Sequence, residues 1–275
     1  MPPDHRTLSD DAMLGGRLRL LQPKRGHRFG HDAVLLAASV PAKSKDHAVE
    51  FGAGVGAASL ALLARVRGLA VTMIEIDPAL AELAAQNIAR NGFAQSARAV
   101  VLNAGSAARA FAAKGLTAGS ADHVFMNPPF NDETHRASPD RMKRRAHMAT
   151  RHLLSHWIAA GTRLLRAKGT LTVIWRADGL PSVLDALSAK FGWVTILRVH
   201  GKEGGDAIRV IVQAVKGGRT SPSLLPPLVL NGRDNHPTAD AEKVMRDLAP
   251  LALAEVISLG GSSGRSILRR NRRRG

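Results

Sequence analysis

The 275-residue sequence has no cysteine, few acidic residues and no long apolar run. The lack of cysteine excludes disulfides, thiolate metal sites and a cysteine nucleophile. No stretch reaches the roughly 18 apolar residues of a membrane-spanning helix, and Asp4, Asp10 and Asp11 stand where a signal peptide needs its apolar segment. We therefore expect a cytoplasmic protein that does not bind a membrane.

The histidines do not predict a metal site. Although the chain has 11 of them, His147 and His152 are five residues apart, which does not match the H-E-x-x-H spacing of zinc enzymes. We expect no metal.

Basic residues far outnumber acidic ones. Lys and Arg total 39 against 22 Asp and Glu, which gives a formal net charge of +17. A field of this sign concentrates polyanions at the surface and speeds their capture, so nucleic acid is the expected partner. Part of this charge lies in a C-terminal run that is expected to be disordered, because like charges repel one another. Its arginines are Arg265, Arg269, Arg270, Arg272, Arg273 and Arg274.

Apolar, β-branched runs alternate with amphipathic segments rich in Ala and Leu, which is typical of βαβ units around a parallel sheet. We predict a Rossmann-like, doubly wound α/β fold with a mostly parallel seven-stranded sheet. The last two strands are joined by only six residues, so they should be antiparallel, with an antiparallel strand at one sheet edge. The expected strands are 47–51, 70–75, 98–102, 123–126, 170–175, 194–200 and 207–213, and the expected helices are 32–39, 56–65, 78–91, 150–167, 180–191 and 239–249.

Three glycines, Gly52, Gly54 and Gly56, lie between the first of these strands and the next helix. Glycine lets the main chain turn tightly and approach a ligand closely. Together with Ala57, the loop satisfies the dinucleotide pattern G-x-G-x-x-G/A, while no Lys-Ser or Lys-Thr follows to make a phosphate-binding P-loop. The loop therefore predicts a nucleotide-like cofactor without saying which one.

Two acidic residues follow the next strand. Glu75 stands where a carboxylate can bind the hydroxyls of a ribose, and we assign it to the cofactor. Asp77 precedes Pro78, and an Asp-Pro pair is typical of a helix N-cap and first helical position, so we assign Asp77 to capping.

The quartet Asn127-Pro128-Pro129-Phe130 follows the fourth strand, at the sheet edge where open α/β folds bind ligands. Proline fixes φ and lacks an N–H, so the carbonyls of Asn127 and Pro128 and the Asn127 amide oxygen can form a set of acceptors. Such a set suits an exocyclic amine, which becomes more nucleophilic when its hydrogens are held so that the nitrogen is pyramidal. Phe130 can stack on a flipped base. We predict that all four residues, Asn127, Pro128, Pro129 and Phe130, are catalytic.

With these two motifs, the sequence resembles class I S-adenosylmethionine-dependent methyltransferases that carry an amino-methylating N-P-P-F motif. It looks most similar to the bacterial tRNA(Val) adenine-37 N6-methyltransferase group. The resemblance extends over nearly the whole chain and implies S-adenosylmethionine as cofactor and adenine N6 in tRNA or another RNA as acceptor. Further segments that carry it are Leu14-Gly15-Gly16-Arg17, Gln22-Pro23, residues 26–37 and Leu228-Val229-Leu230-Asn231-Gly232.

The resemblance also implies roles for individual residues. Arg28 to Asp32 should line the methionine end of the cofactor, and Glu50 should face its ammonium group. Relatives usually carry an acid after the third strand to hold the adenine of the cofactor, which this chain lacks, and Asn103 or Ser106 can substitute. The predicted cofactor-binding set is Arg28, Phe29, Gly30, Asp32, Glu50, Gly52, Gly54, Gly56, Glu75, Asn103, Ser106 and Asn127.

We expect four segments: an N-terminal extension with a cofactor-covering helix (1–40), the methyltransferase core (41–218), a C-terminal appendage (219–262) and the basic tail (263–275). The stretch from His135 to His152 is expected to be a mobile flap that binds RNA phosphates, with a solvated loop as the alternative. Its predicted RNA-binding residues are Arg136, Arg141, Lys143, Arg144 and Arg145.

The leading hypothesis is therefore methylation of adenine N6 in RNA. A related enzyme could instead methylate a protein glutamine amide, although the high positive charge argues against it. The missing third-strand acid leaves open a noncatalytic RNA-binding protein that retains the fold. The glycine loop alone also permits a nicotinamide dehydrogenase.

Overall fold

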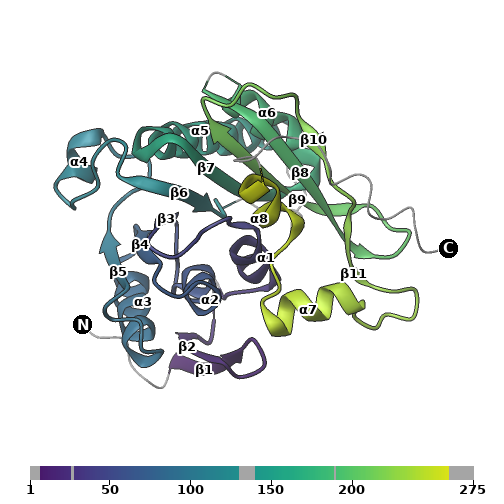
Figure 1. Cartoon of the computed structure of the whole chain (residues 1–275), viewed down its shortest axis with the longest axis horizontal. Helices are drawn as coiled ribbons and strands as arrows, with labels where there is room; N and C mark the ends of the chain where they lie inside the picture. Colours follow the sequence, from purple (N-terminus) through teal and green to yellow (C-terminus); the bar gives the residue numbers. More distant parts are fainter. Residues whose placement is uncertain (1–6, 26–27, 130–139, 189, 260–275) are drawn as a thin grey trace.

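The computed structural model describes residues 7–25, 28–129, 140–188 and 190–259, with only the main chain of residues 140–150 and 256–259. Within these residues, a nine-stranded sheet lies between two layers of helices (Figure 1). Its strand order is β10-β8-β9-β7-β6-β3-β4-β5, and β11 also pairs with β8.

The parallel part of the sheet is formed by consecutive βα units. Its strands are β3 (His47–Phe51), β4 (Ala70–Glu75), β5 (Ala97–Val101), β6 (Ala121–Met126) and β7 (Leu165–Arg176). The remaining strands are β8 (Phe191–Lys202), β9 (Ala207–Lys216), β10 (Ser223–Leu224) and β11 (Leu228–Asn231).

The predicted α/β fold, its seven strands and its antiparallel pair are confirmed. β9 lies between β7 and β8 and runs antiparallel to both. The antiparallel pair is not at the outer edge of the sheet, because β10 and β11 pair with the far side of β8. These two short strands increase the sheet from the predicted seven strands to nine. The first part of the expected C-terminal appendage thus extends the sheet.

Helices cover both faces of the sheet (Figure 1). No helix in the described part of the chain combines the length and apolar character needed to cross a membrane. One face is covered by α1 (His31–Ser39), α2 (Ala57–Arg65), α3 (Pro78–Arg90) and α8 (Ala252–Leu259), with α7 (Ala239–Asp247) beside α1 and β11. The other is covered by α4 (Ala108–Ala112), α5 (Asp140–Leu164), the 3₁₀ turn η3 (Ala177–Gly179) and α6 (Leu180–Leu187).

Helix α3 begins as predicted. The Asp77 carboxylate accepts hydrogen bonds from the main-chain N–H groups of Ala79 at 2.7 Å and Leu80 at 3.3 Å, and Pro78 is the first helical residue. The capping role of Asp77 is confirmed.

Helix α5 begins at Asp140, ten residues before the predicted start at Thr150. Much of the stretch that was expected to be a flap is therefore helical in its main chain. Its first turns have few apolar residues, so the periodicity that indicates a buried helix face is weak there.

An N-terminal hairpin formed by β1 (Leu8–Met13) and β2 (Leu18–Pro23) was not predicted. Its strands are short, and β1 contains two adjacent acidic residues that interrupt the apolar alternation on which strand prediction depends.

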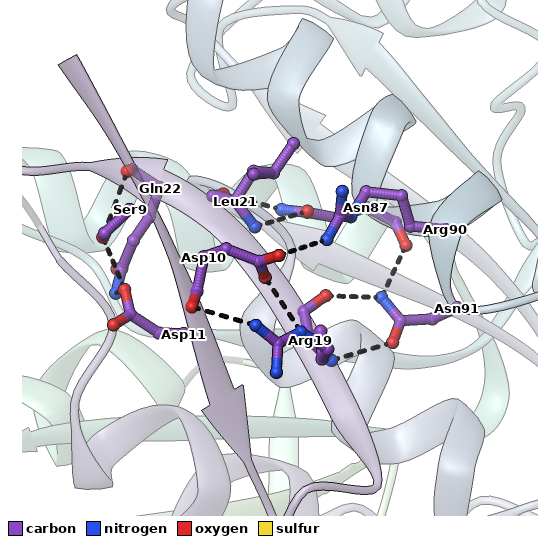
Figure 2. A network of polar contacts seen from close by, with 9 residues as sticks. All are labelled: Ser9, Asp10, Asp11, Arg19, Leu21, Gln22, Asn87, Arg90 and Asn91. Carbon is purple, nitrogen blue, oxygen red and sulfur yellow. Dashed lines mark hydrogen bonds and ion pairs between the residues drawn. The ribbon is translucent and has the colours of Figure 1, made fainter. Parts of the chain in front are cut away.

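Asn87 of α3 and Asn91, the C-cap residue of that helix, hold this hairpin (Figure 2). The Asn87 amide accepts from Leu21 N–H at 2.8 Å and donates to the Leu21 carbonyl at 2.9 Å. The Asn91 amide does the same with Arg19, at 3.0 and 2.9 Å. The two side chains thus bind β2 as a neighbouring strand would. Asn87 also donates to the Val55 carbonyl at 3.0 Å, which ties the hairpin to the glycine loop.

We expect Asn87→Leu to lower the free energy of unfolding by about 3 kcal/mol, because Asn87 is fully buried and its loss leaves main-chain groups without partners. Asn91→Leu is the matched comparison. Its side chain is only half-buried, so water can replace the lost bonds and the expected cost is about 1 kcal/mol. Urea denaturation of both variants measures the difference, and equal losses would contradict the special role of Asn87.

Candidate active site

A cavity of about 550 Å³ opens at the carboxyl ends of β3 and β6. This volume lies within the usual range for small-molecule and cofactor sites. The cavity brings together ten of the residues predicted from the sequence, which come from three separate parts of the chain: Arg28, Phe29, Gly30, Asp32, Glu50, Gly52, Gly54, Asn127, Pro128 and Pro129.

Four other predicted cofactor residues do not line the cavity. Gly56 is the N-cap of α2, with φ of +89°, and a Cβ there would lie 3.0 Å from the Met73 sulfur. The Asn103 side chain accepts from Gly105 N–H at 2.8 Å within its own turn. The structure does not place Asn103 or Ser106 against the cavity, so their contact with a cofactor stays a prediction, and Glu75 is discussed below.

The predicted residues after the N-P-P-F prolines fall largely outside what the structure describes. Phe130 and Arg136 lie outside the described residues. For the other predicted RNA-binding residues the structure describes only the main chain and no side chains. These residues are Arg141, Lys143, Arg144 and Arg145.

Several cavity residues were missed by sequence reasoning. Ile208 and Arg209 reach the cavity from β9, and Leu230 reaches it from β11. The pairing of β8 with β9 shifts by one residue near Ile208, forming a β-bulge, and bulges near active sites re-aim side chains. Ile208 is 46% exposed, which is high for a large apolar side chain in a sheet. Leu230 lies in a segment that carries the family resemblance but was not assigned to the site, and only the sheet topology brings the three residues together here.

The glycine loop is fixed from two sides. Gly52 has φ of +69°, and a Cβ there would lie 2.6 Å from the Trp157 ring on α5, so only glycine fits. On the other side, the Glu75 carboxylate accepts from Gly54 N–H at 2.7 Å and from the N–H groups of Ile76 and Asp77 at 2.8 and 3.0 Å. Glu75 therefore holds the loop directly.

The Glu75 carboxylate keeps an acceptor position for a hydroxyl group of a ribose. A carboxylate has about four acceptor positions, and main-chain N–H groups occupy three of them. The oxygen that faces Gly54 keeps one position for a ligand hydroxyl. Because Glu75 is 7% exposed and is not part of the cavity lining, its contact with a ribose stays a prediction.

Glu75→Ala should weaken S-adenosylmethionine binding by about tenfold or more, because the loop loses hydrogen bonds to a charged acceptor. Isothermal titration calorimetry measures the change in Kd. Glu82→Ala is the matched control, because Glu82 is an exposed residue of α3 whose side chain accepts a hydrogen bond from Gln86 at 3.2 Å and does not contact the glycine loop. An unchanged Kd in Glu75→Ala would remove this residue from the site.

Glu50 is a buried acid in the cavity wall, with 4% of its surface exposed. Its carboxylate accepts from Ser59 N–H at 3.1 Å and from the Ser59 hydroxyl. Burial raises the pKa of Glu50 to about 8, and the nearby charge of Glu75 also raises this pKa, while the bonds from Ser59 lower it. Such a carboxyl group favours a cationic partner.

The N-terminal hairpin positions the segment that closes one side of the cavity. Gln22 is buried, accepts from Phe29 N–H at 3.1 Å and donates to the Asp11 carboxylate at 2.7 Å. Asp11 also pairs with Arg28 at 2.9 Å. Hydrogen bonds from Gln22 and Ser9, together with Arg28, lower the pKa of Asp11 below its usual value. The hairpin thus fixes both Arg28 and Phe29.

An ion pair joins the two sides of the cavity. The Arg209 guanidinium on β9 lies 2.9 Å from the Asp32 carboxylate on α1, and each side chain is about one-quarter exposed. Asp32 is therefore already paired with a cation.

The Asn127 amide oxygen is the most informative atom of the site. It is buried, belongs to a residue of the cavity lining directly after β6, and has no hydrogen-bond partner among the described residues. A buried acceptor without a partner costs free energy in the isolated protein, so this oxygen can gain a hydrogen bond from a ligand that reaches the cavity.

The donor and acceptor set of the cavity fits S-adenosylmethionine. The glycine loop allows close approach of the main chain, Glu50 offers a carboxyl group to an ammonium, and Arg28 offers a cation to a carboxylate. Asn127 also lines this cavity, and no described residue forms a hydrogen bond with its amide oxygen.

Comparison with known proteins indicates the family. A family model described as the methyltransferase small domain matches residues 27–202. The chain is similar to the tRNA1(Val) (adenine(37)-N6)-methyltransferase of Porphyromonas gingivalis, with 32% identity over 157 residues that cover 56% of this chain and 60% of that protein. It is also similar to the ribosomal RNA small subunit methyltransferase A of Mycolicibacterium vanbaalenii, with 42% identity over 81 residues.

The match to the ribosomal RNA methyltransferase covers 28% of this chain and a quarter of that protein. Among solved structures, a predicted O-methyltransferase from Agrobacterium tumefaciens is similar, with a TM-score of 0.67 and 25% identity over 79% of this chain and 96% of that one. Because the family model matches well over half of the sequence, the chain belongs to the methyltransferase small domain family, and its cofactor is S-adenosylmethionine.

Proposed function

We propose that the protein methylates an exocyclic amine and that the acceptor is N6 of an adenine in tRNA. The observation that carries the proposal is the buried oxygen of Asn127, which has no partner in the described part of the chain and belongs to a residue of the cavity that the glycine loop also lines. An acceptor in this position suits a substrate that brings N–H groups.

The reaction depends on positioning. The Asn127 amide oxygen and the Pro128 carbonyl accept the two hydrogens of the amine, so the nitrogen lone pair turns out of the plane of the ring. When bound, S-adenosylmethionine supplies a methyl group on a positively charged sulfur. The glycine loop, Glu50 and Arg28 would hold the cofactor, which would supply the methyl group for the new nitrogen–carbon bond and keep the electron pair of the broken carbon–sulfur bond. The nitrogen then releases a proton to water, and because an arylammonium is strongly acidic, no strong base is needed. Correct placement of the reactants supplies most of the rate.

Two observations support RNA as the substrate class. The formal net charge of +17 favours a polyanion over a protein acceptor. The two relatives described above are named as methyltransferases of tRNA adenine N6 and of ribosomal RNA. The predicted basic residues after the N-P-P-F motif belong to this proposal as contacts to phosphates.

The test is methyl transfer from radiolabelled S-adenosylmethionine to bulk tRNA or to total protein, followed by nucleoside and amino-acid analysis. Label in N6-methyladenosine is the expected result. Label in a protein glutamine, or in a hydroxyl group as the name of the Agrobacterium neighbour suggests, would overturn the amine-in-RNA proposal. Cofactor binding without any transfer would favour the noncatalytic RNA-binding alternative.

A further inference from the structure

A second, smaller cavity of about 160 Å³ lies beside the main one, between α1, β11 and α7. The two cavities share His31 and Leu230 in their linings. The smaller cavity is below the usual volume of a site for a free ligand. A molecule that occupies the main cavity can instead extend one group into it.

The walls of this cavity are held rigidly. Thr238 caps α7 by accepting from Ala241 N–H at 3.2 Å, and its hydroxyl donates to the Val229 carbonyl of β11. The Asn231 amide donates to the Gly201 carbonyl of β8 at 3.0 Å, and Asn231 also forms a bridge with Pro237. The cavity therefore exists before a ligand arrives.

The chemistry of the lining matches a nucleobase. Leu230 and Met245 are partly buried and pack against the main apolar cluster, so they offer apolar contacts to a flat ring. His31 is exposed and forms no hydrogen bond or ion pair within the described part of the chain, so its imidazole ring is available for stacking. Single-stranded RNA bases commonly stack on such side chains.

The rim carries one exposed acid, Glu242, and one exposed cation, Arg246. Arg246 is exposed on α7 and has no ion pair with any described residue. A guanidinium beside a base-sized cavity suits the phosphate that joins that base to its neighbour.

We propose that this cavity binds the base of the nucleotide next to the methylated adenosine, with Arg246 pairing with the phosphate between the two. The inference rests on the proposed function, because it assumes an RNA acceptor in the main cavity. It assigns to β11 and α7 a role in selecting adenosines whose neighbour is unstacked and can enter the cavity.

The test uses an RNA stem-loop with a target adenosine in the loop, and two further RNAs in which the 5′ or the 3′ neighbour is abasic. With the wild-type protein, removal of one of these neighbours should raise KM about tenfold, the loss expected for one stacked base. With Met245→Trp, which fills the cavity, the intact and abasic RNAs should have nearly equal KM. The subsite would be overturned if removal of neither neighbouring base changed KM. It would also be overturned if the abasic RNA still had a higher KM than the intact RNA with Met245→Trp.

A second pair of variants does not depend on repacking. Arg246→Glu should weaken RNA binding and reduce the slope of log Kd against log salt by about one. Lys243→Glu makes the same change of charge on the same helix, where Lys243 lies 3.7 Å from Asp240 and outside the cavity lining. Equal effects of the two substitutions would remove Arg246 from the subsite.

Failure of this inference and failure of the proposed function give different results. If the intact stem-loop is methylated at adenosine N6 but the neighbour has no influence, only the subsite is wrong. If no RNA is methylated, the proposed function falls, and the subsite falls with it.

Discussion

The Asn127→Ala variant should lose about 100- to 1000-fold in kcat, while its Kd for S-adenosylmethionine changes little. This is the range of loss seen when one preorganised polar contact to a reacting group is removed. The Asn127 oxygen is buried without a partner among the described residues, so its hydrogen bond is available to the substrate amine. Single-turnover methylation of tRNA and calorimetry of cofactor binding measure the two quantities separately.

Asn127→Asp is the conservative comparison. A carboxylate keeps an acceptor at the same position, whereas alanine removes it. We therefore expect Asn127→Asp to retain more kcat than Asn127→Ala. If the alanine variant instead loses kcat and cofactor affinity in equal measure, Asn127 holds the cofactor rather than the amine.

Most of the sheet could be predicted from the sequence because its strands are buried on both faces. The segments that became β3, β4 and β6 are short apolar runs, and burial by helices on both sides requires such runs. The β1–β2 hairpin and the start of α5 could not be predicted in this way. The hairpin depends on bonds from Asn87 and Asn91, which are distant in sequence, and the first turns of α5 are rich in charge.

The residues of the candidate site also fall into those that could be predicted from the sequence and those that could not. Residues that lie directly after strands, such as Gly52 and Asn127, could be predicted because the carboxyl ends of parallel strands meet at one edge. Ile208 and Leu230 could not, because they reach the cavity through a bulge and through an added edge strand. Glu75 was predicted to bind the ribose from its position, which stays a prediction, and the sequence could not show that its carboxylate anchors the glycine loop.

Cofactor binding should strengthen as pH rises towards 8, and Glu50 should be the cause. Burial raises the pKa of this carboxyl group to about 8, so it is mostly protonated at neutral pH in the absence of cofactor. If the ammonium of S-adenosylmethionine binds beside it, the charged form is favoured and the bound-state pKa falls. Between these two pKa values, Kd should decrease by about tenfold per pH unit.

Glu50→Gln is the matched variant, because a glutamine amide oxygen can accept the same bonds from Ser59. It should abolish the Glu50 part of the pH dependence and leave only the titration of the cofactor amine. Calorimetry in buffers with different ionisation enthalpies should also show proton release on binding to the wild type near pH 7, reduced in the variant. If Kd depended on pH in the same way in both proteins, Glu50 would not be the residue that faces the ammonium.

The free energy of unfolding of the cofactor-free protein gives an independent measurement. It should fall as pH rises, whereas cofactor affinity should increase. A carboxyl group with a raised pKa in the folded state contributes most at low pH, and this contribution is lost as pH rises from the unfolded value of 4.5 to about 8. The free energy of unfolding should therefore fall by roughly 1.4 kcal/mol per pH unit in this window, and the fall should be absent in Glu50→Gln. Because deprotonation destabilises the empty site and strengthens cofactor binding, saturating S-adenosylmethionine should stabilise the wild type more at pH 8 than at pH 6.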